Sequence, residues 1–441
     1  MYRRASVPSS APAEPVHLFV IIHGYMGIAH NVDELAKSLR RQFGSQALVF
    51  VPNSFGVLRT LDGIDVCSRR VLVQLRALVA EHPSLRALSL VGYSMGGLMA
   101  RYLAGALLVA EPAPFLGLTP TNLVTIACPH LGPRLDHSSS ISSRLFLLLG
   151  RTVGGRSGLQ MTNADGDRLL ALMACRRSAF HRGLAAFERR ALYANAHGDN
   201  TVPFWSAFVS TPWQHGTPAP PPEPPPAHGQ VATTAGGAHH PHIEWEGVGL
   251  GATVAENHTP TSYLPREGFS WAQAACLCAL LLFALCIFLP IWLTVVLPTV
   301  LTLSLCRGVL VRECPPLDAS LIALHPEGSK PEDGGHGNSA HEHAESIAES
   351  RYGAVASAER WSIQVLEAAV AASTARTMQE WMAGELNSLV WHKASVRFTL
   401  ARDGLLSLHT HGHIVVRSQL TGRAGMDVLA HAASNMMHPR V

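Results

Sequence analysis

Short apolar runs alternate with amphipathic stretches over the first half of the chain. Five runs have strand length, at 16–22, 47–51, 88–91, 122–127 and 191–196. They are nearly continuous in hydrophobic character, which is typical of parallel strands covered on both faces. Two stretches between them, 31–43 and 60–80, carry apolar residues at helical spacing. Strands that alternate with helices predict an α/β fold with a mostly parallel, doubly wound sheet.

The hydrophobic pattern changes after residue 210. Residues 211–265 are rich in Pro, Gly and His and predict a linker, and residues 325–351, rich in His, Glu, Gly and Ser, predict a second disordered tract. Segments of this composition cannot bury enough apolar surface to fold. Helical spacing returns within 355–387, and a last main strand is expected at 395–400. The predicted core therefore comprises residues 16–210 and 355–438, with residues 1–15 disordered.

A long apolar run separates the two low-complexity tracts. Residues 268–306 contain no Asp, Glu, Lys or Arg. A bilayer span needs about 20 apolar residues, so this run is long enough for one span and too short for two spans and a turn. Pro290 and Pro298 interrupt helical hydrogen bonding past its middle. We expect 268–311 to form a monotopic hairpin on a membrane or lipid droplet, with a single span as the alternative.

Composition and charge restrict the class of partner and the compartment. The 441 residues are 47% hydrophobic, and the formal charge of +3 gives no signature of nucleic-acid binding. Four of the eight cysteines lie in the apolar run, which favours a reducing compartment over a secreted disulfide framework. Residues 1–15 contain no apolar signal-peptide core. These features predict an intracellular, membrane-associated protein on the cytosolic face.

One G-x-S-x-G pattern lies between a predicted strand and a predicted helix. Gly92 and Gly96 stand two positions either side of Ser94, directly after the run at 88–91. This is the context of a nucleophile elbow, in which a sharp turn exposes a serine hydroxyl at the edge of the sheet. The glycines allow strand and helix to approach closely. In a glycine-rich chain the bare pattern also occurs by chance, so its partners decide the interpretation.

The strand at 16–22 ends in His23-Gly24-Tyr25. In α/β-hydrolases an HG turn after an early strand supplies one oxyanion donor. The backbone N–H groups of Tyr25 and of Met95, after the nucleophile, would stabilise a tetrahedral intermediate. A plain strand-ending turn is the alternative.

A candidate acid follows the strand at 191–196. Asp199 lies in a G-D-x-x-V-P turn, where a carboxylate could orient a histidine. Asp165 and Asp167 are competitors, and they fall in an insertion at about 133–190 that predicts a helical cap or ordinary surface packing. The base should follow the last strand, in the order Ser, Asp, His.

Several motifs in one order resemble the putative serine esterase family of lipase-like α/β-hydrolases. They are HGYMG, TLDGIDVCSRRV, VGYSMGGLMARYL and NLVTIACPHLGPR, followed by VGGRSGLQ, FERRALYAN and LNSLVWHK. The stretch MTNADGD departs from the apolar segment expected there, which leaves the local structure of the cap open. The family's histidine precedes I-x-V-K/R by three positions, and this maps onto His411, with His413 as the alternative base. The resemblance covers 16–205 and 387–431.

The resemblance implies a serine hydrolase that cleaves carboxylic esters of lipids, either acylglycerols or phospholipids. Ser94 would be the nucleophile, His411 the base and Asp199 the acid, and no metal or cofactor is expected. Fold alone does not fix function. Two alternatives therefore stay open: a catalytically silent lipid-binding or membrane scaffold, and an acyltransferase that uses the same triad.

Overall fold

The computed structural model describes residues 14–133, 148, 150–152, 154–199, 201–210, 240–248, 282, 289–299, 301–302, 317–324, 359–403, 410–417 and 424–438. The predicted tract at 325–351 lies outside these residues, as do most of the N-terminus, the linker and the apolar run predicted to form a hairpin or span. Within the described ranges, no helix is long and apolar enough to cross a membrane.

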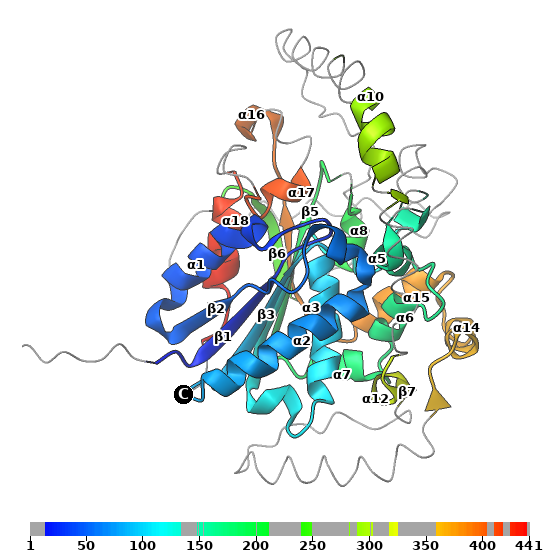
Figure 1. The fold of residues 1–441 in the computed structure, drawn as a ribbon, viewed down its shortest axis with the longest axis horizontal. Helices are drawn as coiled ribbons and strands as arrows, with labels where there is room; N and C mark the ends of the chain where they lie inside the picture. The colour runs from blue at the N-terminus through cyan, green and yellow to red at the C-terminus, as the bar shows by residue number, and fades with distance from the viewer. Residues whose placement is uncertain are drawn as a thin grey trace, which may run out of the picture.

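A seven-stranded sheet forms the centre of the molecule (Figure 1). Its spatial order is β2-β1-β3-β4-β5-β9-β6, and neighbouring strands are parallel except for the β6–β9 pair. The strands are β1 (His17–Ile22), β2 (Ala47–Phe50), β3 (Ala87–Tyr93), β4 (Thr119–Ile126), β5 (Arg189–Asn195), β6 (Ile243–Val248) and β9 (His392–Val396). All residues of β1 and β3 are buried, as their apolar sequences predict.

Helices cover both faces of the sheet (Figure 1). One face packs in a large apolar cluster against α2 (Ile64–Glu81), α3 (Met95–Leu108), α6 (Leu169–Ala174), α7 (Ala179–Ala185) and α15 (Met378–Leu386). The other face packs against α1 (Asp33–Phe43) and α18 (Met426–Ser434). This arrangement confirms the predicted α/β fold with a mostly parallel sheet.

Shorter elements complete the described chain. The 3₁₀ helices are η1 (Ala29–Val32), η2 (Gly44–Gln46), η3 (Val57–Asp62) and η4 (Pro114–Gly117), and η7 (Trp292–Val296) is a π-helix. A two-stranded sheet pairs β7 (Ala323–Leu324) with β8 (Glu359–Arg360). The remaining helices are α5 (Gly155–Met161), α8 (Phe204–Phe208), α10 (Leu289–Ile291), α12 (Ala319–Ile322), α14 (Ile363–Ala372), α16 (Leu400–Asp403) and α17 (Thr410–His413).

Three sequence expectations in the second half were wrong in part. The last parallel strand is His392–Val396, earlier than the predicted 395–400. The helical region within 355–387 is two helices, separated at 373–377. The predicted linker at 211–265 contains β6, which pairs with β9 in an antiparallel register. Its sequence, IEWEGV, alternates apolar and charged residues over too short a stretch to stand out inside a Pro- and His-rich tract.

The strand order reverses between β1 and β3. From β1 the chain moves outward to β2, and it then returns to the other side of β1 as β3. Ligands of open parallel sheets bind at the carboxyl ends of the strands at such a reversal, where the loops after two neighbouring strands diverge. The fold therefore places the loops that follow Ile22 and Tyr93 at its most favourable binding position.

Candidate active site

Ser94 occupies a strained turn between β3 and α3. Its backbone has φ 55° and ψ −127°, a conformation that side-chain-bearing residues rarely adopt. A Cβ on Gly92 would lie 2.3 Å from the Gly96 carbonyl oxygen, and one on Gly96 would lie 2.1 Å from that of Ile22. Only glycine fits at either position, so the two glycines allow the close packing that produces the turn.

The imidazole of His411 lies between Ser94 and Asp199. Its Nε2 is 3.0 Å from the Ser94 hydroxyl oxygen, and its Nδ1 is 2.8 Å from Asp199 Oδ2. Ser94 lies 317 residues from His411 in the sequence, and Asp199 lies 212 residues from it, so the fold brings together side chains that are far apart in the sequence. A histidine held on one side by a carboxylate and on the other by a serine hydroxyl can accept the serine proton.

The Asp199 carboxylate is fixed by several further hydrogen bonds. Oδ1 accepts from the Thr201 and Val202 backbone N–H groups, at 3.0 and 2.9 Å, and from the Thr201 hydroxyl at 2.8 Å. Oδ2 also accepts from the Asn195 amide at 3.0 Å. Burial by itself would raise the pKa of Asp199, but the neighbouring His411 and these donors outweigh it and hold the pKa below its ordinary value. The carboxylate is therefore ionised, as a partner of imidazolium must be.

His411 is anchored through its own backbone and that of its neighbour. The Tyr93 hydroxyl donates to the His411 carbonyl oxygen at 2.9 Å. Thr410 donates its N–H to the Gly198 carbonyl at 3.0 Å and its hydroxyl to the His197 carbonyl at 2.9 Å. The base thus lies on the short helix α17, where a loop was expected. These bonds connect the base-bearing helix to the elbow strand and to the acid turn.

The ring of His411, and not that of the alternative His413, lies between Ser94 and Asp199. Both residues belong to α17, and the ring contacts to Ser94 and Asp199 are those of His411. His413 is buried, with 8% of its surface exposed, two residues further along. The Tyr93 and Thr410 hydroxyls were not singled out from the sequence, and no motif marks them apart from their adjacency to Ser94 and His411.

The turn after β1 lies directly beside the nucleophile. A Cβ on Gly24 would lie 2.7 Å from the Ser94 Cβ and 3.2 Å from its Oγ. Thr60 Oγ1 accepts from the Met26 N–H at 2.9 Å, and the Tyr25 hydroxyl donates to the Gly154 carbonyl at 3.1 Å. Met95 is the first residue of α3, where backbone N–H groups have no intrahelical acceptor. Gly24, next to Tyr25, and Met95, at the start of α3, therefore adjoin Ser94 from two elements.

Two helices in the described part of the predicted cap, α6 and α7, pack in the core. Every residue of α6 is at most 1% exposed, and α7 packs against α3 so closely that a Cβ on Gly183 would lie 2.2 Å from the Ala104 carbonyl oxygen. Gly154, directly before α5, contacts the turn after β1 through the hydrogen bond from Tyr25. Both α6 and α7 therefore belong to the apolar cluster that covers one face of the sheet.

Other polar residues near the motifs have structural roles. His130 follows β4 but is fully buried, and its Nε2 lies 2.9 Å from the Thr125 hydroxyl. Asp65 pairs with Arg69 at 2.8 Å and with Arg156 of α5 at 2.9 Å. The competitor Asp165 caps α6 by accepting from the Leu169 N–H at 2.9 Å. Across the described parts of the chain, no group of three or more His, Cys, Asp or Glu residues is arranged to hold a metal ion.

Comparison with known proteins supports a lipase-like hydrolase. Residues 12–212 match the sequence profile of the family described as putative serine esterase, which confirms the resemblance for this part of the chain. The chain is 27% identical over 209 residues to "Putative lipase ROG1" of Saccharomyces cerevisiae and 28% identical over 211 residues to "Putative lipase C4A8.10" of Schizosaccharomyces pombe. Each match covers 46% of this chain, but only 30% and 27% of those relatives.

Solved structures are more distant. The RedJ thioesterase from the prodiginine pathway of Streptomyces coelicolor matches with 21% identity and a TM-score of 0.24, over 46% of this chain and 82% of that one. Phospholipase PlaB from Legionella pneumophila matches with 17% identity and a TM-score of 0.28, over 42% and 39% of the respective chains.

Proposed function

We propose that residues 12–212, which match the putative serine esterase family, are completed by His411 to form a serine hydrolase that cleaves carboxylic esters of lipids. One observation carries the proposal: a single imidazole lies 3.0 Å from Ser94 Oγ and 2.8 Å from Asp199 Oδ2. His411 falls outside the part that the family profile matches, so geometry alone joins it to the nucleophile and the acid.

The first half-reaction forms an acyl-enzyme. His411 Nε2 removes the proton of Ser94 Oγ as this oxygen attacks the ester carbonyl carbon. The Tyr25 and Met95 N–H groups donate to the oxygen that becomes negative, and loss of one such donor typically costs about 10²–10³ in rate. The resulting imidazolium gives its proton to the departing alcohol. Asp199 stabilises the imidazolium and holds Nε2 toward Ser94.

The second half-reaction releases the acyl group. Water takes the place of the alcohol, His411 removes its proton, and the hydroxide attacks the acyl carbon. Collapse of this second tetrahedral intermediate breaks the bond to Ser94 Oγ, which regains a proton from His411. An acyltransferase would run the same steps with an alcohol in place of water.

Lipid esters are the proposed substrates because of the relatives' names and the apolar run. The two yeast relatives are named putative lipases. In the described part of the run, Ile291, Leu293 and Val295 are 54%, 48% and 59% exposed, an unusual exposure for three large apolar side chains within five residues. We propose that this segment associates with a membrane or lipid droplet and so brings Ser94 to acylglycerols or phospholipids.

Lipid hydrolysis by the full chain tests the activity. Wild type and Ser94→Ala are incubated with mixed acylglycerols and with glycerophospholipids, and released fatty acid is measured by mass spectrometry. We expect release by wild type and none above background by Ser94→Ala. Equal release by both would refute the proposal. A chain that binds lipid vesicles without releasing acid would support the silent scaffold, and acyl transfer to an added alcohol would support the acyltransferase.

Vesicle flotation tests the association separately. The full chain and a variant lacking 268–306 are mixed with phosphatidylcholine vesicles and with triacylglycerol droplets and are then floated on a density gradient. We expect flotation of the full chain and loss of flotation in the deletion variant. Unchanged flotation of that variant would show that the apolar run is not the anchor.

A further inference from the structure

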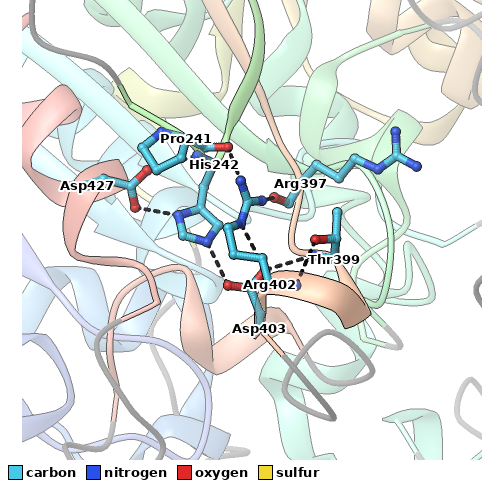
Figure 2. A network of polar contacts seen from close by, with 7 residues as sticks. All are labelled: Pro241, His242, Arg397, Thr399, Arg402, Asp403 and Asp427. Atoms are coloured by element: carbon cyan, nitrogen blue, oxygen red, sulfur yellow. Dashed lines mark hydrogen bonds and ion pairs between the residues drawn. The ribbon is translucent and has the colours of Figure 1, made fainter. Parts of the chain in front are cut away.

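A charged cluster lies next to the helices that follow β9 (Figure 2). The His242 imidazole stands between two carboxylates: Nε2 is 2.8 Å from Asp403 Oδ1, and Nδ1 is 2.7 Å from Asp427 Oδ1. Asp427 Oδ2 also accepts from the His242 backbone N–H at 2.9 Å. Because both ring nitrogens face carboxylate oxygens, both must carry a proton, and the ring is an imidazolium.

The surrounding groups complete the hydrogen bonding of the cluster. Asp403 Oδ2 accepts from the Thr399 N–H at 2.7 Å and lies 3.4 Å from Arg402 Nε. The Arg402 guanidinium donates to the Pro241 carbonyl and, at 2.8 Å, to the Arg397 carbonyl (Figure 2). The cluster therefore fixes the turn before β6, the turn after β9 and the start of α18 to one another.

The titratable and charged groups that face His242 come from every element packed against it. Asp403 and Arg402 belong to α16, Asp427 to α18, and His240 contacts the Asp427 carbonyl at 3.1 Å. Burial lowers the pKa of His242, but the hydrogen bonds to Asp427 and Asp403 outweigh burial and the Arg402 charge, so the pKa lies above 6.5. Beyond His240, His431 Nε2 lies 3.2 Å from Glu246 Oε2.

The cluster connects to the base through direct backbone contact. Gly425, two residues before Asp427, packs so tightly that a Cβ on it would lie 2.0 Å from the His413 carbonyl oxygen. His413 is in the same helical turn as His411. Ile414 and Val428 are fully buried in one apolar cluster. A shift of the start of α18 must therefore displace α17, and with it the imidazole that contacts Ser94.

We infer that His242 is a positioning residue for His411: it bridges Asp403 and Asp427, which lie on either side of the base in the sequence, and holds α18 against α17. The inference rests on the proposed function for the role of His411. The inference also assigns a structural role to β6, because His242 immediately precedes this strand. The chain that returns from the 211–239 insertion thereby completes the placement of the base.

The bridge requires the protonated ring, which makes it pH-dependent. A raised folded-state pKa means that the stabilisation is fully present below the unfolded value of 6.5 and is lost as the pH rises through the folded value. Deprotonation leaves one ring nitrogen facing a carboxylate with no proton between them. Reactivity of Ser94 should then decline at alkaline pH, whereas a general base acting alone gives a rate that rises with pH and levels off.

The test is the rate of Ser94 labelling by a fluorophosphonate in the full chain from pH 5.5 to 9.5. The variants are His242→Gln, which cannot donate to both carboxylates, and Asp403→Asn, which keeps an acceptor oxygen but removes a charge. The matched control is His181→Gln. His181 is also buried and hydrogen-bonded, 3.1 Å from the Glu385 carbonyl, and burial lowers its pKa to about 4, so it stays neutral across this range.

We expect wild type and His181→Gln to show the same alkaline decline. His242→Gln should label about 10- to 100-fold more slowly near neutrality, the loss expected for a base displaced by up to about 1 Å, and without the decline. Asp403→Asn should move the decline to lower pH, which a simple loss of folding would not do. A wild-type rate that stays level to pH 9.5, or a decline retained in His242→Gln, would overturn the inference. If wild type fails to label at any pH, the proposed function fails instead.

Discussion

Replacement of Gly24 by alanine tests whether the turn after β1 lies where the oxyanion of the reaction would form. The Gly24 backbone is outside the left-handed region, so alanine can adopt its conformation. The added Cβ would, however, lie 2.7 Å from the Ser94 Cβ, and an ordinary contact begins at 3.4 Å. Either Ser94 or the turn must move by about 0.7 Å to remove the clash. Displacements near 1 Å in an active site cost up to about 10²-fold in rate.

We therefore expect Gly24→Ala to label with a fluorophosphonate about 10- to 100-fold more slowly than wild type. Gly384→Ala is the matched control, because a Cβ at this helical position meets nothing within 4 Å. Alanine there should leave labelling unchanged and add up to about 1 kcal/mol of stability. Thermal unfolding measured on both variants separates a local displacement from unfolding. Wild-type labelling by a folded Gly24→Ala protein would refute the packing of this turn on Ser94.

Two further changes test the site, and one tests the buried carboxyl that caps α6. Asp199→Asn keeps the shape of the acid but cannot stabilise imidazolium, so labelling should fall by about 10⁴-fold; a fall of less than tenfold would contradict its role. Tyr93→Phe removes the donor to the His411 carbonyl and should slow labelling by about tenfold, the equivalent of one hydrogen bond, whereas Tyr193→Phe, whose hydroxyl contacts His431 away from the site, should not. Burial raises the pKa of Asp165 to about 6, so its favourable contribution is present below 3.8 and is lost as the pH rises through about 6. Asp165→Asn should thus stabilise the chain at pH 8 by about 1 to 3 kcal/mol and not at pH 4, as urea unfolding at the two values would show.

The nucleophile elbow could be predicted from the sequence because the residues that form it are neighbours in the chain. Ser94 needs a strand before it, a helix after it and glycine at two nearby positions, and all of these lie within a dozen residues. The mostly parallel sheet with helices between its strands followed from the alternation of apolar runs and amphipathic stretches. Such features depend on neighbours in sequence, where hydrophobic periodicity and turn chemistry are informative.

The sequence limited the candidate base to two histidines, and local pattern alone could not decide between them. His411 and His413 lie in one four-residue helix, and their directions are fixed by the contacts of Tyr93 and Thr410 with distant carbonyls. His130 likewise follows a strand of the sheet, β4, but its ring is fully buried in the core. In both cases tertiary packing, which the sequence does not display, decides where the ring points.

No sequence pattern predicted a role for His242. It stands at the end of a His-, Pro- and Gly-rich tract, where composition favours a linker over a strand. Its role depends on two carboxylates that are 161 and 185 residues away. The antiparallel pairing of β6 with β9 places His242 beside the turn that carries Asp403, and the packing of α18 adds Asp427.

The central claim is that Ser94 is a nucleophile activated by His411. Mass spectrometry of the intact chain after fluorophosphonate treatment, followed by peptide mapping, tests it most directly. We predict one adduct per chain on Ser94, none in Ser94→Ala, and a greatly reduced rate of formation in His411→Ala with His413 intact. Undiminished labelling in His411→Ala, or an adduct that persists in Ser94→Ala, would contradict the account.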